Sequence, residues 1–312
     1  MNSSTALAAT FPLHLSGCTA PVRRVSLPDA VDAPRCTVRL GDLGRVSYYR
    51  AGPEEGRPLV LVHSINAAPS VYEMKPLFEH YRITRPVFAL DLPGFGFSDR
   101  PNRPYSPAVF VSAIREFLRE VVGQPADLIG LSLGCEFIAR VAIESPELVR
   151  SLVLLSPTGF SSRTMRGGEK GMRLHGVLSL PALSQGVWSA LTSRPSIRYF
   201  LGQSHVGEVP QEMIDYAYAT SHQPGARYAP LYFLAGQIFT PDAPNTLYAK
   251  VAQPVLAIYD RDPYINFDLL PGFLDGRSNW RAERIGPALG LPHWERFPET
   301  IVAVDRFWAE QA

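Results

Sequence analysis

The sequence predicts a three-layer α/β fold, in which a mostly parallel sheet is covered by helices on both faces. Short apolar runs without polar–apolar alternation recur along the chain, as expected of strands that are buried on both faces. Amphipathic stretches with helical spacing separate these runs, and this order is typical of parallel α/β proteins. The 312 residues, of which 46% are hydrophobic and 19% charged, suffice for one large core with an insertion.

Residues 1–35 lack periodicity and are rich in Ser, Thr, Pro and Ala, so we expect an irregular N-terminal arm. Within it, residues 15–18 (Leu-Ser-Gly-Cys) are similar to a bacterial lipoprotein cleavage site. A signal of that type needs a basic start and an unbroken apolar stretch. No Lys or Arg precedes Arg23, and Pro12 and His14 interrupt the apolar residues. We therefore interpret the match as chance and expect a cytoplasmic protein.

The hairpin, the buried strands and two helices follow in order. Segments 36–40 and 45–49 alternate around a Gly-Asp-Leu-Gly turn, which predicts a β-hairpin at a sheet edge. Buried strands are expected at the apolar runs 58–62, 87–90, 127–130, 152–155 and 255–259. Helical spacing predicts a helix over 106–122, opened by a Ser-Pro pair, and a last helix near 302–308.

The strand–helix rhythm breaks between about 160 and 250. This stretch is rich in Pro, Gly and aromatic residues and has no clean strand run, and short helices are expected at 184–191, 210–220 and 228–237. Most of its aromatic side chains must pack the insertion onto the core, and any that face a pocket would make it bulky and apolar. We expect a core of 36–160 and 250–312, with a helical cap over 161–249.

Charge and cysteine content exclude several classes of protein. The formal net charge of +1 argues against electrostatic binding of nucleic acid, which needs clustered positive charge. No apolar run approaches the length of a membrane span. Cys18, Cys36 and Cys135 are too few and too scattered for a disulfide framework or a four-ligand zinc site. A Gly-x-Gly at Gly94 and Gly96 lacks the third glycine of a dinucleotide loop, so no dinucleotide cofactor is expected. The sequence also shows no metal-ligand spacing, so no metal is expected.

The chemistry is predicted by Gly130-Leu131-Ser132-Leu133-Gly134, which stands between an apolar run and an amphipathic stretch. This is a Gly-x-Ser-x-Gly pattern in the strand–turn–helix context of a nucleophile elbow. A turn this tight strains the serine backbone and tolerates only small neighbours, but it exposes the hydroxyl at the positive end of the following helix. Cys135, on the same helix, is expected to be buried packing.

With this motif, the chain resembles an α/β-hydrolase-fold protein with a helical cap, over about residues 36–310. Residues 91–101 are similar to the loop after strand four of that family, and 61–66 stand where the family has its oxyanion loop. The resemblance implies an eight-stranded, mostly parallel sheet with a cap inserted after strand six. Because the elbow holds Ser132, members with a carboxylate nucleophile, such as haloalkane dehalogenases and epoxide hydrolases, do not fit.

A serine needs a neighbouring base, and the base needs an orienting acid. In the family the order along the chain is nucleophile, acid, histidine. The strand expected at 255–259 is followed by Asp260 and Asp262. The family often places its acid before a residue such as Pro263, so Asp262 is the predicted acid and Asp260 the reserve. No acidic residue falls within 155–160, which removes the alternative position after strand six.

The predicted base is His293. Family members often read Gly-His-x-Pro-His-x-Glu near the end, with the first histidine catalytic, and that position here is Gly290. Either a shifted loop allows His293 to serve as base, or the triad is broken and the protein is a non-catalytic relative. We favour the first interpretation, because His293 is the only histidine beyond the acid strand.

Two backbone amides are expected to stabilise the oxyanion, Leu133 directly after the nucleophile and Ile65 in the loop after the first buried strand. Ser64 replaces a family glycine and is expected to reshape this loop. Asn66 is either a further donor or, as we favour, a cap for a helix near Ser70. His63 is expected to be structural.

The predicted function is hydrolysis of an apolar, ester-like carboxylic small molecule through an acyl-enzyme. The same machinery serves C–C hydrolases and acyltransferases, which differ in pocket shape and water access. The alternative from another class is a catalytically silent protein that binds a ligand or partner, favoured by the departures at Gly290 and Ser64.

Overall fold

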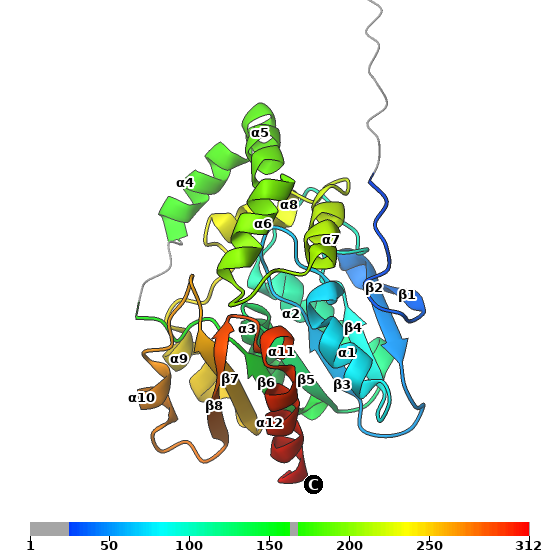
Figure 1. Cartoon of the computed structure of the whole chain (residues 1–312), viewed down its shortest axis with the longest axis vertical. Coiled ribbons are helices and arrows are strands. Elements are labelled where there is room, and N and C mark those ends of the chain that lie inside the picture. Colours follow the sequence, from blue (N-terminus) through cyan, green and yellow to red (C-terminus); the bar gives the residue numbers. More distant parts are fainter. Residues whose placement is uncertain (1–24, 163–167, 312) are drawn as a thin grey trace, which may run out of the picture.

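The computed structural model describes residues 25–162 and 168–311, with helices on both faces of a sheet and a helical layer above one end of it (Figure 1). The segment 15–18 lies outside the described residues, as does most of the predicted arm. Residues 25–34 are irregular as expected, but Ala30 and Val31 are buried in the core.

Among the described residues the sheet has eight strands, and only the second runs opposite to all the others. The strands are β1 Arg35–Leu40, β2 Gly44–Ala51, β3 Leu59–Val62, β4 Val87–Leu90, β5 Ala126–Leu131, β6 Val149–Leu155, β7 Val255–Arg261 and β8 Trp280–Leu289. Their order is β1-β2-β4-β3-β5-β6-β7-β8, with β1 and β2 antiparallel to their neighbours. The predicted fold class and the hairpin at the edge are confirmed. Strand β8 was not anticipated, because it is an edge strand with several exposed charged residues instead of an apolar run.

The two faces of the sheet pack against different helices. In β3, Val60 and Val62 join the core that includes residues of α2 Pro107–Phe117 and α3 Gly134–Glu144. Leu59 and Leu61 point the other way, into the core with α1 Lys75–Tyr81 and α12 Phe297–Ala309. The short helices α10 Leu270–Leu274 and α11 Pro292–Glu295 lie on either side of β8 in the sequence. This is the three-layer arrangement that the apolar runs predict.

Two local predictions need correction. The helix expected over 106–122 is α-helical only to Phe117 and continues as a π-helical turn, Leu118–Val122. The Ser106 side chain makes no capping hydrogen bond. The remaining short elements are 3-10 turns, at Gly41–Leu43, Val71–Met74, Pro146–Leu148 and Tyr248–Lys250.

The segment between β6 and β7 is helical. It contains α4 Gly168–Leu178, α5 Pro181–Leu191, α6 Arg194–Gln203, α7 Gln211–Ser221, α8 Tyr228–Leu234 and α9 Ala243–Thr246. The three short helices that the sequence predicts correspond to α5, α7 and α8. Trp188 and Tyr216 are buried, but Tyr199 and Phe200 are 62% and 43% exposed, so not every aromatic residue packs onto the core.

This helical layer contacts segments that follow the parallel strands. A Cβ at Gly94, after β4, would meet Ala229 of α8, and one at Gly159, after β6, would meet Ala243 of α9. The helices therefore cover the end of the sheet at which parallel strands present their carboxyl termini, where ligands bind in open α/β sheets.

Candidate active site

Ser132 occupies a tight turn between β5 and α3. Its φ of 52° lies in the left-handed region, which is rare for a residue with a side chain. The Ser132 N–H donates to the Leu155 carbonyl at 2.8 Å, and the Ser132 carbonyl accepts from the Cys135 N–H at 3.1 Å. Ser132 itself is only half-buried. The neighbours thus hold a strained turn that leaves this serine accessible, as the motif predicts.

The two glycines of the motif are required by close packing. A Cβ at Gly130 would lie 2.8 Å from the Ile138 side chain, within the first turns of α3. A Cβ at Gly134 would lie 2.6 Å from the carbonyl oxygen of His63. Both distances are shorter than real Cβ contacts, so the start of α3 can approach the loop after β3 only because residue 134 is glycine.

Hydrogen bonds link the carboxyl ends of the strands in a row. The Ser132 N–H reaches β6 at Leu155, and the Ser156 N–H reaches β7 at Ile258 at 2.8 Å. Arg261 at the end of β7 pairs with Leu289 at the end of β8. The segments that follow β5, β6, β7 and β8 therefore meet along one edge. Ser156, which the sequence analysis did not single out, also has a positive φ, and its buried hydroxyl has no partner among the described residues.

The predicted oxyanion donors are the N–H groups of Ile65 and Leu133. Both residues are buried, and neither N–H donates to another backbone group among the described residues. The contact of Gly134 with His63 brings their two loops together. This arrangement is compatible with a pair of free donors near the hydroxyl of Ser132.

A residue that the sequence analysis missed, Glu73, organises the oxyanion loop. Its carboxylate accepts from the Ser64 N–H at 2.9 Å, from the Ser64 hydroxyl at 3.0 Å and from the Asn66 side-chain amide at 2.7 Å. Asn66 also accepts from the Ala68 N–H at 2.7 Å, so the expectation that it caps a helix near Ser70 is wrong. The sequence offered one indication that Glu73 has a local structural role. Ser70 and Glu73 have the Ser-x-x-Glu spacing of a capping box at a helix N-terminus.

His63 is structural, as expected. Its Nε2 accepts from the Leu92 N–H at 2.9 Å, and its Nδ1 lies 2.6 Å from the Ser64 carbonyl. Burial lowers the pKa of His63. Cys135 is likewise buried, with its thiol 3.1 Å from the Gly130 carbonyl, and burial raises its pKa.

Asp262 follows β7 and is half-buried. Its Oδ1 accepts from the N–H groups of Tyr264 at 2.8 Å and Ile265 at 3.2 Å. Its Oδ2 has no hydrogen-bond or ion-pair partner among the described residues. Burial raises the pKa of Asp262, although the two N–H groups oppose the shift. One carboxylate oxygen is thus fixed by the backbone, and the other is free.

The reserve acid, Asp260, is engaged elsewhere. Its carboxylate accepts from the Arg284 guanidinium at 2.7 Å and from the Ala288 N–H at 3.0 Å, both on the edge strand β8. Burial by itself would raise the pKa of Asp260, but these two contacts outweigh it and lower the pKa. Asp260 thus stabilises the irregular part of β8, which Gly286 allows because a Cβ there would clash with the carboxylate.

Gly290 stands directly opposite the free oxygen of Asp262. An ideal Cβ on Gly290 would lie 2.8 Å from Asp262 Oδ2. Apart from this carboxylate and the adjoining residues of the chain, no described residue lies within 4 Å of it. The φ of Gly290 is 98°, a conformation that residues with side chains rarely adopt. The position that the family resemblance assigns to a histidine is therefore a glycine, and a Cβ there would crowd a carboxylate oxygen.

His293 is fully buried in α11 and turned away from these groups. Its Nε2 lies 2.8 Å from the Glu73 carbonyl, which also accepts from Trp294 at 2.7 Å. Its Nδ1 is buried without a partner among the described residues. Burial lowers the pKa of His293 to about 4, so the ring is neutral and Nε2 carries the proton that it donates.

The structure therefore does not bring His293 to Ser132. No imidazole among the described residues is hydrogen-bonded to Ser132 or to Asp262. The geometry does not support the predicted role of His293 as base, because the ring would have to leave the Glu73 carbonyl and its loop would have to move. The physical reason is that Gly290, the residue beside Asp262, has no side chain. The next imidazole along the chain is that of His293, which is buried in α11.

Buried groups fix the helical layer above this edge. Glu136, four residues after Ser132, accepts from the Thr158 hydroxyl at 2.5 Å and from the Thr240 N–H at 2.8 Å. Burial raises the pKa of Glu136. Farther along the edge, the Tyr72 ring stacks between Tyr216 of α7, at 4.5 Å, and Trp294, at 5.8 Å. The elbow helix and α11 are thus each tied to the helices above them.

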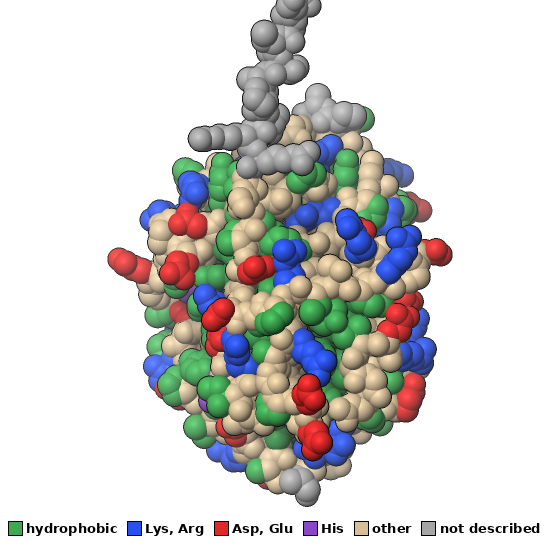
Figure 2. All heavy atoms as spheres, turned by 90° about the vertical axis from the view of Figure 1, so that its right-hand side faces the viewer, with side chains coloured by type: hydrophobic (Ala, Val, Ile, Leu, Met, Phe, Trp, Pro, Cys, Tyr) green, Lys and Arg blue, Asp and Glu red, His purple; other side chains and the backbone are tan. Residues whose placement is uncertain are grey.

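Other kinds of site are less well supported by the part of the chain that the structure describes. In those residues no group of three or more His, Cys, Asp or Glu side chains is arranged to hold a metal ion. No helix among them is long and apolar enough to cross a membrane. On the face shown in Figure 2, Lys and Arg side chains alternate with Asp and Glu side chains instead of forming a basic surface.

The chain was compared with known proteins. A family model described as "Alpha/beta hydrolase family" matches residues 59–304. The (lyso)-N-acylphosphatidylethanolamine lipase of Mus musculus is 35% identical over 133 residues, which are 40% of this chain and 38% of that protein. The 2-hydroxymuconate semialdehyde hydrolase of Pseudomonas putida is 37% identical over 136 residues, which are 42% and 48% of the two chains. The chain thus matches well under two thirds of the length of these relatives.

Solved structures share the fold at low sequence identity. A serine hydrolase involved in carbazole degradation superposes with a TM-score of 0.72 and 18% identity, covering 89% of this chain and 99% of the other. A meta-cleavage product hydrolase superposes with a TM-score of 0.69 and 19% identity, covering 88% and 98%.

Proposed function

The chain belongs to the alpha/beta hydrolase family, and from that premise we propose that it cleaves an ester-like carboxylic substrate through an acyl intermediate on Ser132. The observation that carries the proposal is the turn at Ser132, with its φ of 52° and its two tightly packed glycines. Strain of this kind persists only where the surrounding structure enforces it, and it is common at catalytic groups.

In this proposal Ser132 attacks the substrate carbonyl, and the N–H groups of Leu133 and Ile65 stabilise the oxyanion that forms. Each such donor is worth on the order of 3 kcal/mol of transition-state stabilisation. Asp262 orients the base and stabilises its protonated form. Water then hydrolyses the acyl-enzyme. His293 stays a predicted base only if its loop moves, since its Nε2 is bonded to the Glu73 carbonyl.

The proposed substrate is a small molecule with an apolar or aromatic acyl group, bound between the sheet and a cap formed by residues 161–249. Support comes from Tyr72, Tyr216 and Trp294, which line up beside the edge that carries the site. No metal, organic cofactor or nucleic acid takes part in this proposal, and the cytoplasm remains the proposed location. The names of the relatives include a lipase, a semialdehyde hydrolase and an O-acyltransferase, so ester hydrolysis, C–C hydrolysis and acyl transfer all fit the family.

A second function is favoured by one specific observation. Gly290 faces Asp262 where a base would be needed, and His293 is bonded elsewhere. A protein with this arrangement and no other source of a base would bind a carboxylic ligand or a partner without turning it over. The two functions differ in whether Ser132 reacts.

The test is labelling of the purified protein with a fluorophosphonate probe, alongside Ser132→Ala and His293→Gln. We expect labelling of the parent that is lost in Ser132→Ala and retained in His293→Gln, because the His293 ring contacts neither Ser132 nor Asp262. Loss of labelling in a folded His293→Gln variant would restore His293 as the base. A folded parent that reacts under no condition would overturn the hydrolase proposal in favour of a binding protein.

A further inference from the structure

We infer that the space beside Gly290 receives a neutral imidazole-like base from outside the chain, which pairs with Asp262 and accepts the proton of Ser132. This inference rests on the proposed function of Ser132. It specifies what the site requires of its ligand: a nitrogen heterocycle with one N–H and one lone pair, either free or as part of the substrate.

The first support is what surrounds the Cβ position of Gly290. Of all described residues other than its chain neighbours, only Asp262 comes within 4 Å of an ideal Cβ on Gly290. With φ at 98°, this backbone conformation strongly favours glycine. A carbon atom 2.8 Å from Asp262 Oδ2 would be too close, whereas an N–H donor fits that distance.

The second support is the unpaired oxygen that borders this space. Asp262 Oδ1 is satisfied by Tyr264 and Ile265, whereas Oδ2 has no partner among the described residues. No Arg, Lys or His is among the groups that shift the pKa of Asp262, which burial raises. A half-buried carboxylate without a cation is stabilised by an N–H donor or a positive charge at its free oxygen.

The third support is that no imidazole of the described residues is hydrogen-bonded here. The His293 ring is committed to the Glu73 carbonyl, and the His63 ring to Ser64 and Leu92. The His205 ring, in the loop after α6, has its Nδ1 2.9 Å from the Leu201 carbonyl. None of these rings is hydrogen-bonded to Asp262 or Ser132.

The free oxygen lies on the same edge as the nucleophile. The strands that lead to Ser132 and Asp262 are separated by β6 alone, and backbone hydrogen bonds connect their ends through Leu155 and Ile258. Gly290 follows Leu289, which pairs with Arg261, the residue before Asp262. A ring placed beside Gly290 therefore has the carboxylate on one side and faces the row of strand ends that includes Ser132.

The proton balance needs nothing else. As the bond between Ser132 Oγ and the carbonyl carbon forms, the hydroxyl proton moves to the lone pair of the ring, whose N–H stays hydrogen-bonded to Asp262. The ring then gives that proton to the leaving oxygen as the ester C–O bond breaks. In deacylation the ring takes a proton from the attacking water and returns it to Ser132 Oγ as the acyl bond breaks.

The experiment measures the rate of fluorophosphonate labelling of the full chain near neutral pH at increasing imidazole concentration. We expect a saturable increase of at least about tenfold, since a positioned base contributes roughly 10²–10⁴-fold. The control is 1-methylimidazole, which is a base of similar strength but has no N–H for Asp262. Labelling is counted only where Ser132→Ala abolishes it.

Variants of the site show where the imidazole acts. Asp262→Asn is expected to lose most of the stimulation, and His293→Gln to keep it. Gly290→Ala is expected to lose it too, because the new methyl group occupies the space 2.8 Å from Asp262 Oδ2. Its matched control is Gly276→Ala, because Gly276 also has a positive φ of 75° but no atom of the described residues lies within 4 Å of its Cβ position.

A second set of substrates distinguishes a free base from one carried by the substrate. Matched aryl esters of N-acetylhistidine and N-acetylphenylalanine are compared without added imidazole, with the Ser132→Ala rate subtracted. Faster turnover of the histidine ester assigns the base to the substrate. Stimulation by imidazole of the phenylalanine ester alone assigns it to a free heterocycle.

Three outcomes would overturn the inference. Labelling of Ser132 that imidazole does not accelerate would mean an internal base, and the proposed function would stand. Equal acceleration by 1-methylimidazole, or undiminished acceleration in Asp262→Asn, would mean catalysis by base in solution. A folded parent that is never labelled, with or without imidazole, would overturn both this inference and the proposed function.

Discussion

At the scale of single residues, the site depends on which atom each side chain faces. Asp262 has one oxygen fixed by two backbone N–H groups and the other free beside Gly290. His293, three residues after Gly290, donates to the Glu73 carbonyl. The Asp262 carboxylate therefore has a free oxygen, but the nearest imidazole along the chain after Gly290 is bonded to a different group.

His293 makes the stability of the protein depend on pH. Burial lowers its pKa to about 4 from the 6.5 expected in the unfolded chain. The unfolded chain therefore binds a proton at a pH where the folded protein does not, and the free energy of unfolding falls as pH drops from about 6.5 to about 4. Each pKa unit corresponds to about 1.4 kcal/mol, so we expect a loss of up to about 3 kcal/mol from this residue. Urea unfolding across this pH range measures it.

The control separates His293 from other titrating groups. His293→Gln can still donate to the Glu73 carbonyl but does not titrate, so its unfolding free energy should fall less steeply between these two pH values. If His293→Gln and the parent lost stability in parallel, the depressed pKa of His293 would be refuted.

At the scale of elements, the turn from β5 to α3 is built by close approach of backbone to backbone. Gly134 allows α3 to begin against the His63 carbonyl, and this contact brings the proposed oxyanion donors of Leu133 and Ile65 together. Glu73, from a neighbouring 3-10 turn, fixes the other side of the loop. The elbow and the oxyanion loop therefore form one rigid unit.

Gly134→Ala is expected to disturb this unit. Its Cβ would lie 2.6 Å from a backbone oxygen that cannot move without shifting the loop, and overpacking of this kind costs about 1–3 kcal/mol. We also expect the rate of fluorophosphonate labelling at Ser132 to fall, because the donor amides move apart. Urea unfolding and labelling rates measure the two effects.

The matched control is Gly176→Ala, in the exposed helix α4, where the described part of the chain places no atom within 4 Å of the Cβ position. This change should be neutral or should stabilise the protein by up to about 1 kcal/mol, through helix propensity. If Gly134→Ala behaved like Gly176→Ala in both measurements, the contact with the His63 carbonyl would not control the site.

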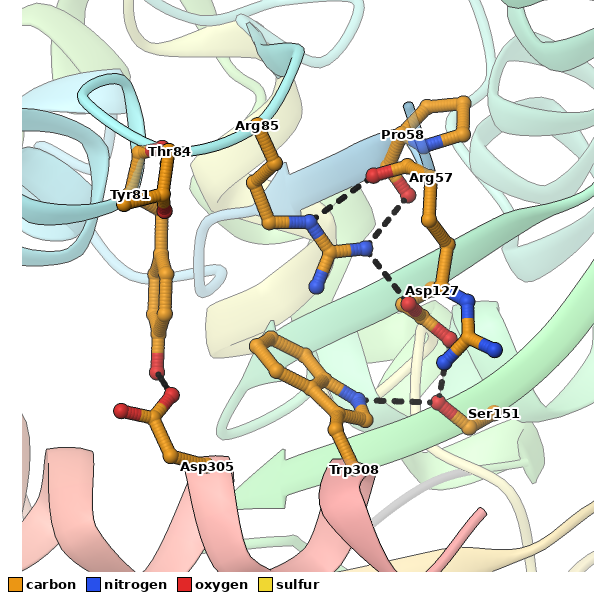
Figure 3. A network of polar contacts seen from close by, with 9 residues as sticks. All are labelled: Arg57, Pro58, Tyr81, Thr84, Arg85, Asp127, Ser151, Asp305 and Trp308. Atoms are coloured by element: carbon orange, nitrogen blue, oxygen red, sulfur yellow. Dashed lines mark hydrogen bonds and ion pairs between the residues drawn. The ribbon is translucent and has the colours of Figure 1, made fainter. Parts of the chain in front are cut away.

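At the scale of the whole molecule, the two ends of the parallel strands differ: one carries the candidate site and the other a buried polar network. The candidate site and the helical layer share the carboxyl ends (Figure 1). At the other end, Asp127 at the start of β5 accepts from Arg85 at 2.5 Å and from Ser151 at 2.7 Å, and Ser151 accepts from Trp308 of α12 at 3.1 Å (Figure 3). This buried network fastens the last helix to the sheet.

Asp127→Ala is expected to destabilise the protein by about 3 kcal/mol, because it leaves the Arg85 guanidinium buried without its carboxylate. Arg85 keeps the carbonyls of Arg57 and Pro58 as partners, which limits the loss. Labelling of Ser132 should be unchanged in the folded variant, since the network lies at the opposite end of the strands. Urea unfolding and fluorophosphonate labelling check both statements.

The control for Asp127→Ala is a substitution in an ion pair on the surface. Arg119 and Glu147 are paired at 3.3 Å, and their side chains are 52% and 60% exposed. Glu147→Ala should change the free energy of unfolding by less than about 1 kcal/mol, because solvent screens exposed pairs. A similar small effect for Asp127→Ala would show that the network is dispensable.

The sequence alone determined the fold class and the tight turn at Ser132, because both depend on local patterns. Buried parallel strands require continuous apolar runs, and the elbow requires glycine on both sides of Ser132. The buried state of Cys135 and the structural role of His63 also followed from their places in these patterns. The position of the edge strand β8 was not predicted from the sequence, because an exposed strand carries charged residues and lacks a continuous apolar run.

The tertiary structure alone decided which side chains meet at the site. Asp260 and Asp262 stand two residues apart, and only the fold shows that the first pairs with Arg284 on β8 and the second faces Gly290. Likewise, nothing in the sequence directs His293 to the carbonyl of Glu73, 220 positions away. The physical reason is that orientation at the strand ends depends on contacts between distant segments, whereas strands and turns are encoded by neighbours in the chain.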